Sequence, residues 1–363
     1  MPHLEELPQE LFDLVLEELR PSDLPNLRLT SRTCAAKVLD CYATVHFTDC
    51  TIHCSAQKRE LAHTLNSFLE IAQIKTFVTR MQSLIFEFPT DFRHSDDVYE
   101  LLDLTIDERM KEIFKAIGRQ TRLKHIHITS APILGDDFTL CEQIRPLNLI
   151  TYGLAGSGLE VAEMTIGGND CNHAPQWTLP YYKLVDKIDY CKFGDVLQTL
   201  TVLRVSAWDC GEWDKMFTVE DLEEAAFRFM NMLSKAPKLK FLALLDSYGP
   251  LDDPSYSMAS DLACTPRLEK TGFPALETLE LENASCDIAG LVEFTKKYQL
   301  KKLILKDVMC FGFMEWVDSK EIVDLEELFD LKKPMSKNFE EWNPDLVAEA
   351  DTATEKWWAE STW

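Results

Sequence analysis

The chain has 363 residues, 46% of them apolar, so it can bury a sizeable core in one large domain or two ordinary ones. Its net charge of -24, from 61 acidic and 37 basic residues, argues against a nucleic-acid partner and against an anionic membrane surface, because both are bound through Lys and Arg. Eleven cysteines, an odd number without a disulfide-like pattern, indicate free thiols in a reducing compartment. With no secretory signal or long apolar run in the sequence, we expect a cytoplasmic or nuclear protein.

The first forty residues predict three short helices that carry more leucine than they can bury. We expect the first helix to begin at Pro8, with Leu11, Leu14, Val15 and Leu19 in one apolar stripe. The sequence "RPSDLPNL" then predicts a break and a second helix capped by Ser22 or Asp23. A third helix is expected in "TSRTCAAKVLDCY", with Thr30 or Ser31 as its N-cap.

The leucines that the three helices cannot bury have two possible roles. The three helices either cap the rest of this chain, or they present a docking face to another protein. A cap would bury Leu11, Leu14 and Leu24 against residues 60–130, whereas a docking face would leave them exposed.

The stretches "LPQELFDLVLEEL" and "SDLPNLRLTSRTC" resemble the F-box, and we assign residues 1–48 to such a three-helix domain. The pairs Leu7-Pro8, Asp23-Leu24 and Ser31-Arg32 all fall in register with the family pattern. One departure is that Cys34 and Ala35 stand where many members carry a bulky aromatic residue. The resemblance implies binding to the Skp adaptor of a cullin-RING ubiquitin ligase through Leu7, Pro8, Leu11, Leu14, Val15, Leu24, Leu27 and Leu29.

An internal repeat follows, in the form apolar-x-x-apolar-x-apolar. Its copies start at residues 81, 123, 161, 200, 239, 276 and 300, so most steps are 37 to 42 residues long. Several copies follow an amphipathic stretch, as in "DERMKEIFKAIGRQTRLKHIHI". Each unit is therefore predicted to be a helix, a turn and a strand, and stacked units would form a parallel sheet with helices on its other side.

This pattern is similar to leucine-rich repeats of an irregular kind with long steps, over residues 60–317. The resemblance implies an α/β solenoid with parallel strands, although the asparagine typical of the family occurs after only one strand, at Asn169. The alternative is an α/β protein with crossover helices and a flatter sheet. Residues 318–363 are acidic and contain Trp342, Trp357, Trp358 and Trp363, so we expect a C-terminal cap or tail, or else a docking motif around "EKWWAESTW".

Side chains between the apolar strand positions are expected to point out of the sheet face that the helices leave open. They form the predicted target-binding surface, and they include an aromatic centre and several charges: His125, His127, Arg204, Trp208, Phe241, Glu280 and Lys302. The alternative is a solvated face whose neighbours pair with each other, with Glu282 meeting Lys306 across adjacent strands.

No pattern in the sequence predicts chemistry. "HFTDCTIHC" places His46, Cys50, His53 and Cys54 close together, but the second ligand pair of a zinc site is missing, so we expect these residues to line the junction after the F-box. No catalytic set can be assembled from spacing, and neither a cofactor nor a metal is expected.

The sequence thus predicts a non-catalytic substrate receptor of an SCF-type ubiquitin ligase. Its F-box would hold the Skp adaptor, and its repeats would hold an unknown target. The alternatives are a scaffold or interaction protein with leucine-rich repeats that acts outside a ligase, with the F-box used only for stability or with the helices as a cap.

Overall fold

The structure, a computed structural model, describes residues 4–55, 57–88, 104–130, 144–167, 190–207, 219–246, 262, 266–311 and 315–323. The chain divides into two compact units, Met1–Glu321 and Ile322–Trp363. The helices and strands below belong to the first unit, apart from the last residue of the final strand.

Three helices form the N-terminal bundle, as the sequence predicts: α1 (Gln9–Glu17), α2 (Leu24–Thr30) and α3 (Arg32–Phe47). Short 3-10 turns, η1 (Leu4–Glu6) and η2 (Pro21–Asp23), precede α1 and α2. The first helix begins one residue later than predicted, because Pro8 has an extended ψ of 152° and is the N-cap. Ser31 caps α3 as predicted, since its hydroxyl accepts a hydrogen bond of 3.1 Å from the backbone N–H of Cys34.

The described strands form one ten-stranded sheet. Its order follows the chain, with β8 paired to β9 beside the main path. The strands are β1 (Asp49–His53), β2 (Ser83–Phe88), β3 (Leu123–Ser130), β4 (Val161–Ile166), β5 (Val202–Ala207), β6 (Phe241–Asp246), β7 (Thr278–Glu282), β8 (Ser285–Asp287), β9 (Lys302–Phe311) and β10 (Glu315–Ile322). Pairing is parallel from β1 to β7, and β9 pairs in parallel with both β7 and β8.

Each of the seven predicted repeats contains one of these strands, β2 to β7 and β9. The strands form there because every second residue is apolar and points to the face covered by the helices, as with the fully buried Leu84 and Phe86 of β2. Strand β1 was not predicted. It begins two residues after α3 ends and joins the sheet beside β2, so the bundle leads directly into the sheet.

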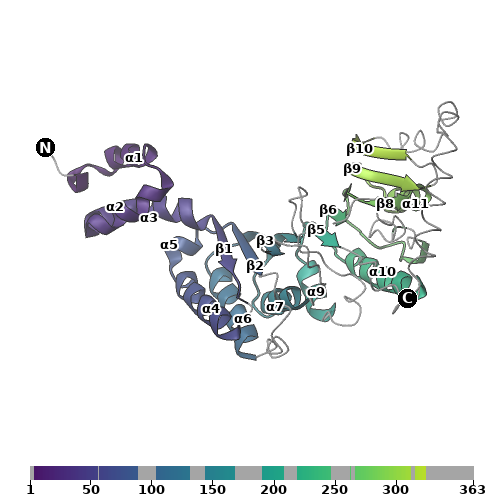
Figure 1. Cartoon of the computed structure of the whole chain (residues 1–363), viewed down its shortest axis with the longest axis horizontal. Coiled ribbons are helices and arrows are strands. Elements are labelled where there is room, and N and C mark those ends of the chain that lie inside the picture. The colour runs from purple at the N-terminus through teal and green to yellow at the C-terminus, as the bar shows by residue number, and fades with distance from the viewer. Residues whose placement is uncertain are drawn as a thin grey trace, which may run out of the picture. The chain divides into compact units, whose positions relative to one another are not determined.

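Helices connect most successive strands: α4 (Lys58–Ala72), α5 (Lys75–Val78), α6 (Leu104–Gly118), α7 (Ile144–Ala155), α9 (Tyr190–Leu197), α10 (Val219–Ser234) and α11 (Ile288–Tyr298). Figure 1 shows α4, α6, α7 and α9 on one side of the first strands, and α4, α6, α7, α9 and α10 contact one another in that order. None of the helices in the described part of the chain is long and apolar enough to cross a bilayer.

The protein is therefore a mixed α/β molecule with a helical N-terminal region and a parallel sheet. The strand order does not reverse along the sheet, unlike that of a doubly wound fold. Because the helices pack in one row, the opposite face of the sheet is available for the polar side chains between the buried positions.

Candidate functional site

Large apolar side chains are exposed on the N-terminal bundle. Leu11 and Leu14 of α1 have 51% and 57% of their surface accessible, and Leu29 at the end of α2 has 85%. Pro8 is also exposed, and Val15 is half-buried. Large apolar side chains left exposed on a small helical bundle are typical of a protein–protein docking face.

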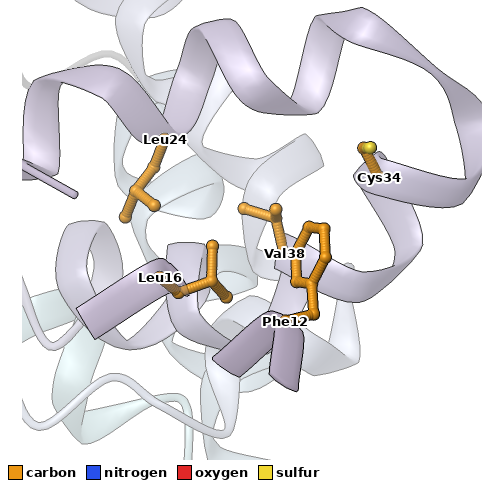
Figure 2. Packing of buried hydrophobic residues seen from close by; sticks show 5 residues of the cluster. All are labelled: Phe12, Leu16, Leu24, Cys34 and Val38. Atoms are coloured by element: carbon orange, nitrogen blue, oxygen red, sulfur yellow. The ribbon is translucent and has the colours of Figure 1, made fainter. Parts of the chain in front are cut away.

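A different set of side chains holds the bundle together. Phe12, Leu16, Leu24, Cys34 and Val38 are buried in one cluster. Figure 2 shows Phe12 beside Val38, with Leu16 turned toward the same interior. Leu7 and Leu27 pack against this cluster and are half-buried.

One prediction about these residues needs correction. Leu24 was expected on the adaptor-facing surface, but it is 2% exposed and lies in the bundle core, because α2 turns its first residue toward α1 and α3. Cys34, where the sequence departs from the family pattern, is buried in the same core.

The exposure of the leucines distinguishes a docking face for another protein from a cap on the rest of this chain. Leu11 and Leu14 are open, and Leu24 is covered by the bundle itself and not by residues 60–130. The described structure therefore supports a face that is open to a partner.

The bundle is joined to the sheet by contacts that sequence reasoning missed. Phe47 of α3 stacks on Phe77 of α5 with ring centroids 4.2 Å apart and planes within 2°. Arg80, just after α5, donates through Nη2 to both carboxylate oxygens of Asp40 on α3, with Oδ2 at 2.7 Å, and through Nε to Oδ1 at 3.1 Å. No local sequence signal links residues 40 positions apart, so only the fold could reveal this pair.

On the open face of the sheet, the structure brings His125 and His127 together on β3. Their rings lie 6.0 Å apart and nearly parallel. The Nε2 of His125 lies 2.9 Å from the Thr165 hydroxyl, and the Nε2 of His127 lies 2.7 Å from the Gly167 carbonyl, so both rings lean toward β4. Burial, with the neighbouring His127 as a smaller cause, lowers the pKa of His125 below its usual value.

Farther along this face, cationic side chains from β5 and β9 converge on one carboxylate of β7. The guanidinium of Arg204 lies 4.5 Å from the centre of the Phe241 ring, and its Nη1 is 3.4 Å from Glu280 Oε1. The Nζ of Lys306 donates to the same oxygen at 2.8 Å. Hydrogen bonding to Glu280 raises the pKa of Lys306 above its ordinary value.

Glu280 was predicted to be a target-binding residue, and the structure contradicts that role. Its side chain is 5% exposed because it lies under Lys306 and Arg204. Lys306 also meets Glu282 at 3.4 Å, as the alternative of pairing between neighbours predicts, although Glu280 is its closer partner. Arg204 and Phe241 are half-buried on this face. Lys302 is also half-buried and pairs with Glu321 at 2.8 Å.

Two predicted features lie outside the described residues. Trp208 follows the last described residue of β5, and the tryptophans of the C-terminal part follow residue 323. Nothing in the structure bears on either of them.

The cysteine and histidine residues after α3 do not come together. Cys50 of β1 and Cys54, the residue after the strand, are buried, whereas His53 at the end of β1 is exposed and pairs with Glu87 at 3.0 Å. Burial raises the pKa of the Cys50 thiol to about 11. In the part of the chain that the structure describes, no group of three or more His, Cys, Asp or Glu side chains is arranged to hold a metal ion.

Comparison with known proteins identifies the N-terminal bundle. Residues 4–45 match the F-box domain family, in agreement with the sequence resemblance. No curated protein matches the chain. The F-box domain implies binding to a Skp adaptor within SCF-type complexes, and it covers the helices that carry the exposed leucines.

Proposed function

We propose that this chain, with its F-box domain at residues 4–45, is a substrate-recognition subunit of an SCF-type E3 ubiquitin ligase. The observation that carries the proposal is the exposure of Leu11, Leu14 and Leu29 on a bundle that already has a complete core. The apolar contact that these leucines would make with the adaptor is worth roughly 25 cal/mol per Å² of buried surface.

The sheet region would hold the target. Its strands recur at the step of the sequence repeat and pair in chain order, which favours an irregular leucine-rich-repeat solenoid. The open face carries half-buried side chains that can contact a partner, among them His125, His127, Arg204 and Phe241. Arg204 is held over an aromatic ring, and aromatic and arginine residues often anchor protein interfaces.

The receptor itself would perform no bond chemistry. It would act by proximity, because holding a target lysine near a ubiquitin-loaded enzyme replaces an encounter in solution with a reaction inside one complex. Such a receptor would work in the cytoplasm or nucleus, with neither a cofactor nor a metal.

Co-expression with a Skp adaptor tests the adaptor-binding face. We expect wild type to be retained on the immobilised adaptor and the Leu11→Asp, Leu14→Asp double variant to be lost. Ile74→Asp is a matched control, because Ile74 is 43% exposed but lies outside the F-box. Retention of the double variant, or loss of wild type and control alike, would contradict the proposed face, provided that circular dichroism shows all three proteins to be folded.

A second function, a scaffold outside the ligase, predicts the same adaptor binding but no ubiquitin transfer. Reconstitution with the cullin, the RING subunit and a ubiquitin-conjugating enzyme separates the two. Ubiquitin chains on the receptor or on a co-purified target would support the ligase. A fully assembled complex that transfers no ubiquitin to either would favour the scaffold.

A further inference from the structure

The start of α1 is not held by a cap of its own. Its N-cap is Pro8, which makes no side-chain hydrogen bond to the first turn. Yet this turn carries Pro8 and leads to the exposed Leu11. A helix end without a cap frays readily, so another part of the molecule must hold this turn in place.

Lys37 of α3 contacts this turn in three ways. Its Nζ donates a hydrogen bond to the carbonyl oxygen of Leu7, the residue before the N-cap. The same ammonium lies 5.5 Å from the centre of the Phe12 ring, which is fully buried. The backbone carbonyl of Lys37 accepts a hydrogen bond of 3.3 Å from the side-chain amide of Gln9, and this amide also donates to Asp13 at 2.7 Å.

We propose that Lys37 is a positioning residue for the adaptor-binding surface, an inference that rests on the proposed function. It ties the stretch from Leu7 to Gln9 to α3, so that Pro8 and Leu11 are presented in a fixed orientation before the adaptor arrives. Ordering this turn in the free protein removes part of the entropy that binding would otherwise cost.

The chemistry of the contact explains why a lysine is suited to this position. The ammonium has three donors on a flexible stem, and it can serve a carbonyl oxygen and an aromatic face at the same time. Both partners belong to the α1 end of the bundle, so loss of the ammonium would loosen the start of α1 more than the rest of α3.

Lys37→Met is the test variant, because methionine keeps an unbranched apolar side chain but removes the charge and the donors. Lys37→Arg keeps a cation that can donate to the Leu7 carbonyl and serves as the rescue variant. Lys75→Met is a matched control, since Lys75 is exposed on α5 outside the F-box.

The first measurement is amide hydrogen exchange in the free full-length chain. With Lys37→Met we expect exchange about tenfold faster at residues 12–16, the amides of α1 from the first one that donates a backbone hydrogen bond, Phe12 to the Pro8 carbonyl. Tenfold is equivalent to about 1.4 kcal/mol, and exchange at residues 39–46 of α3 should be unchanged. Equal acceleration in both segments would show that Lys37 is an ordinary core residue, and unchanged exchange would show that it holds nothing. Either result would overturn the proposal.

The second measurement is the affinity for the Skp adaptor. We expect binding about tenfold weaker with Lys37→Met, the same free-energy change as in the exchange experiment, and close to wild type with Lys37→Arg and Lys75→Met. Wild-type affinity in Lys37→Met would overturn the positioning role even if α1 were looser. A wild type that does not bind the adaptor would refute the proposed function instead, and the exchange data on the free chain would still report whether Lys37 holds α1.

Discussion

The cluster around Glu280 offers a sharp test of the energetics on the open sheet face. Its carboxylate is 5% exposed, whereas its two cationic partners, Lys306 and Arg204, are 42% and 33% exposed. Removing a cation therefore leaves a buried charge, but removing the carboxylate leaves two cations that water can still reach. The two changes should differ in cost even though they break the same contact.

Lys306→Met should cost about 3 kcal/mol. It removes a charge-assisted hydrogen bond of 2.8 Å to Glu280, and breaking a buried pair typically costs about 3–5 kcal/mol. We take the lower end because Arg204 stays at 3.4 Å and compensates part of the charge. Glu280→Gln keeps the shape and an acceptor oxygen, so it should cost only about 1 kcal/mol.

The double variant decides whether this reasoning is right. Glu280→Gln removes the stranded charge, so the double variant should be more stable than Lys306→Met alone. The assay is native-state hydrogen exchange of the amides in β7 and β9, which reports the local free energy of opening. A Lys306→Met variant that costs less than Glu280→Gln, or a double variant less stable than both single ones, would refute the argument.

Two further predictions concern the helix row and β3. Gly153→Ala should destabilise the protein by about 1–2 kcal/mol in urea denaturation, because the added Cβ would lie 2.7 Å from Met110 Cγ. Gly194→Ala in α9 is the matched control: its Cβ would meet open space, so the change should be neutral or stabilise by up to about 1 kcal/mol. A destabilised Gly194→Ala would contradict the packing explanation. The pKa of His125 is lowered in the folded state, so its contribution to stability is present above the ordinary histidine pKa and is lost as the pH falls through the lowered value. His125→Gln should therefore lose less stability than wild type between pH 7 and pH 5 in thermal melts. If the variant loses as much as wild type, protonation of His125 is not the cause of the loss.

Much of the fold was predictable because apolar spacing is a local property. The copies that start at residues 81, 123, 161, 200, 239, 276 and 300 predict β2 to β7 and β9, and the structure confirms all of these strands. The amphipathic stretch quoted before β3 forms α6, and helices α10 and α11 likewise precede β6 and β9. Strand β1 escaped prediction because "DCTIH" is short and carries too few apolar residues to stand out.

The binding surfaces were less predictable, since an apolar residue in the sequence can serve either a core or an interface. The F-box pattern identified the N-terminal helices, yet it placed Leu24 on the surface that the structure assigns to the interior. Similarly, strand alternation placed Glu280 on the open face but could not show that Lys306 and Arg204 would cover it.

The types of the helices and strands, the F-box pattern at the N-terminus and the step length of the repeat could be read from the sequence, because each depends on spacing between residues near one another in the chain. Which leucines remain exposed and which polar groups meet became visible only in the folded structure. Lys37 reaches Leu7 across 30 positions, and Arg80 reaches Asp40 across 40. Contacts of that kind depend on how helices cross and strands register, and periodicity along the chain does not encode these relations.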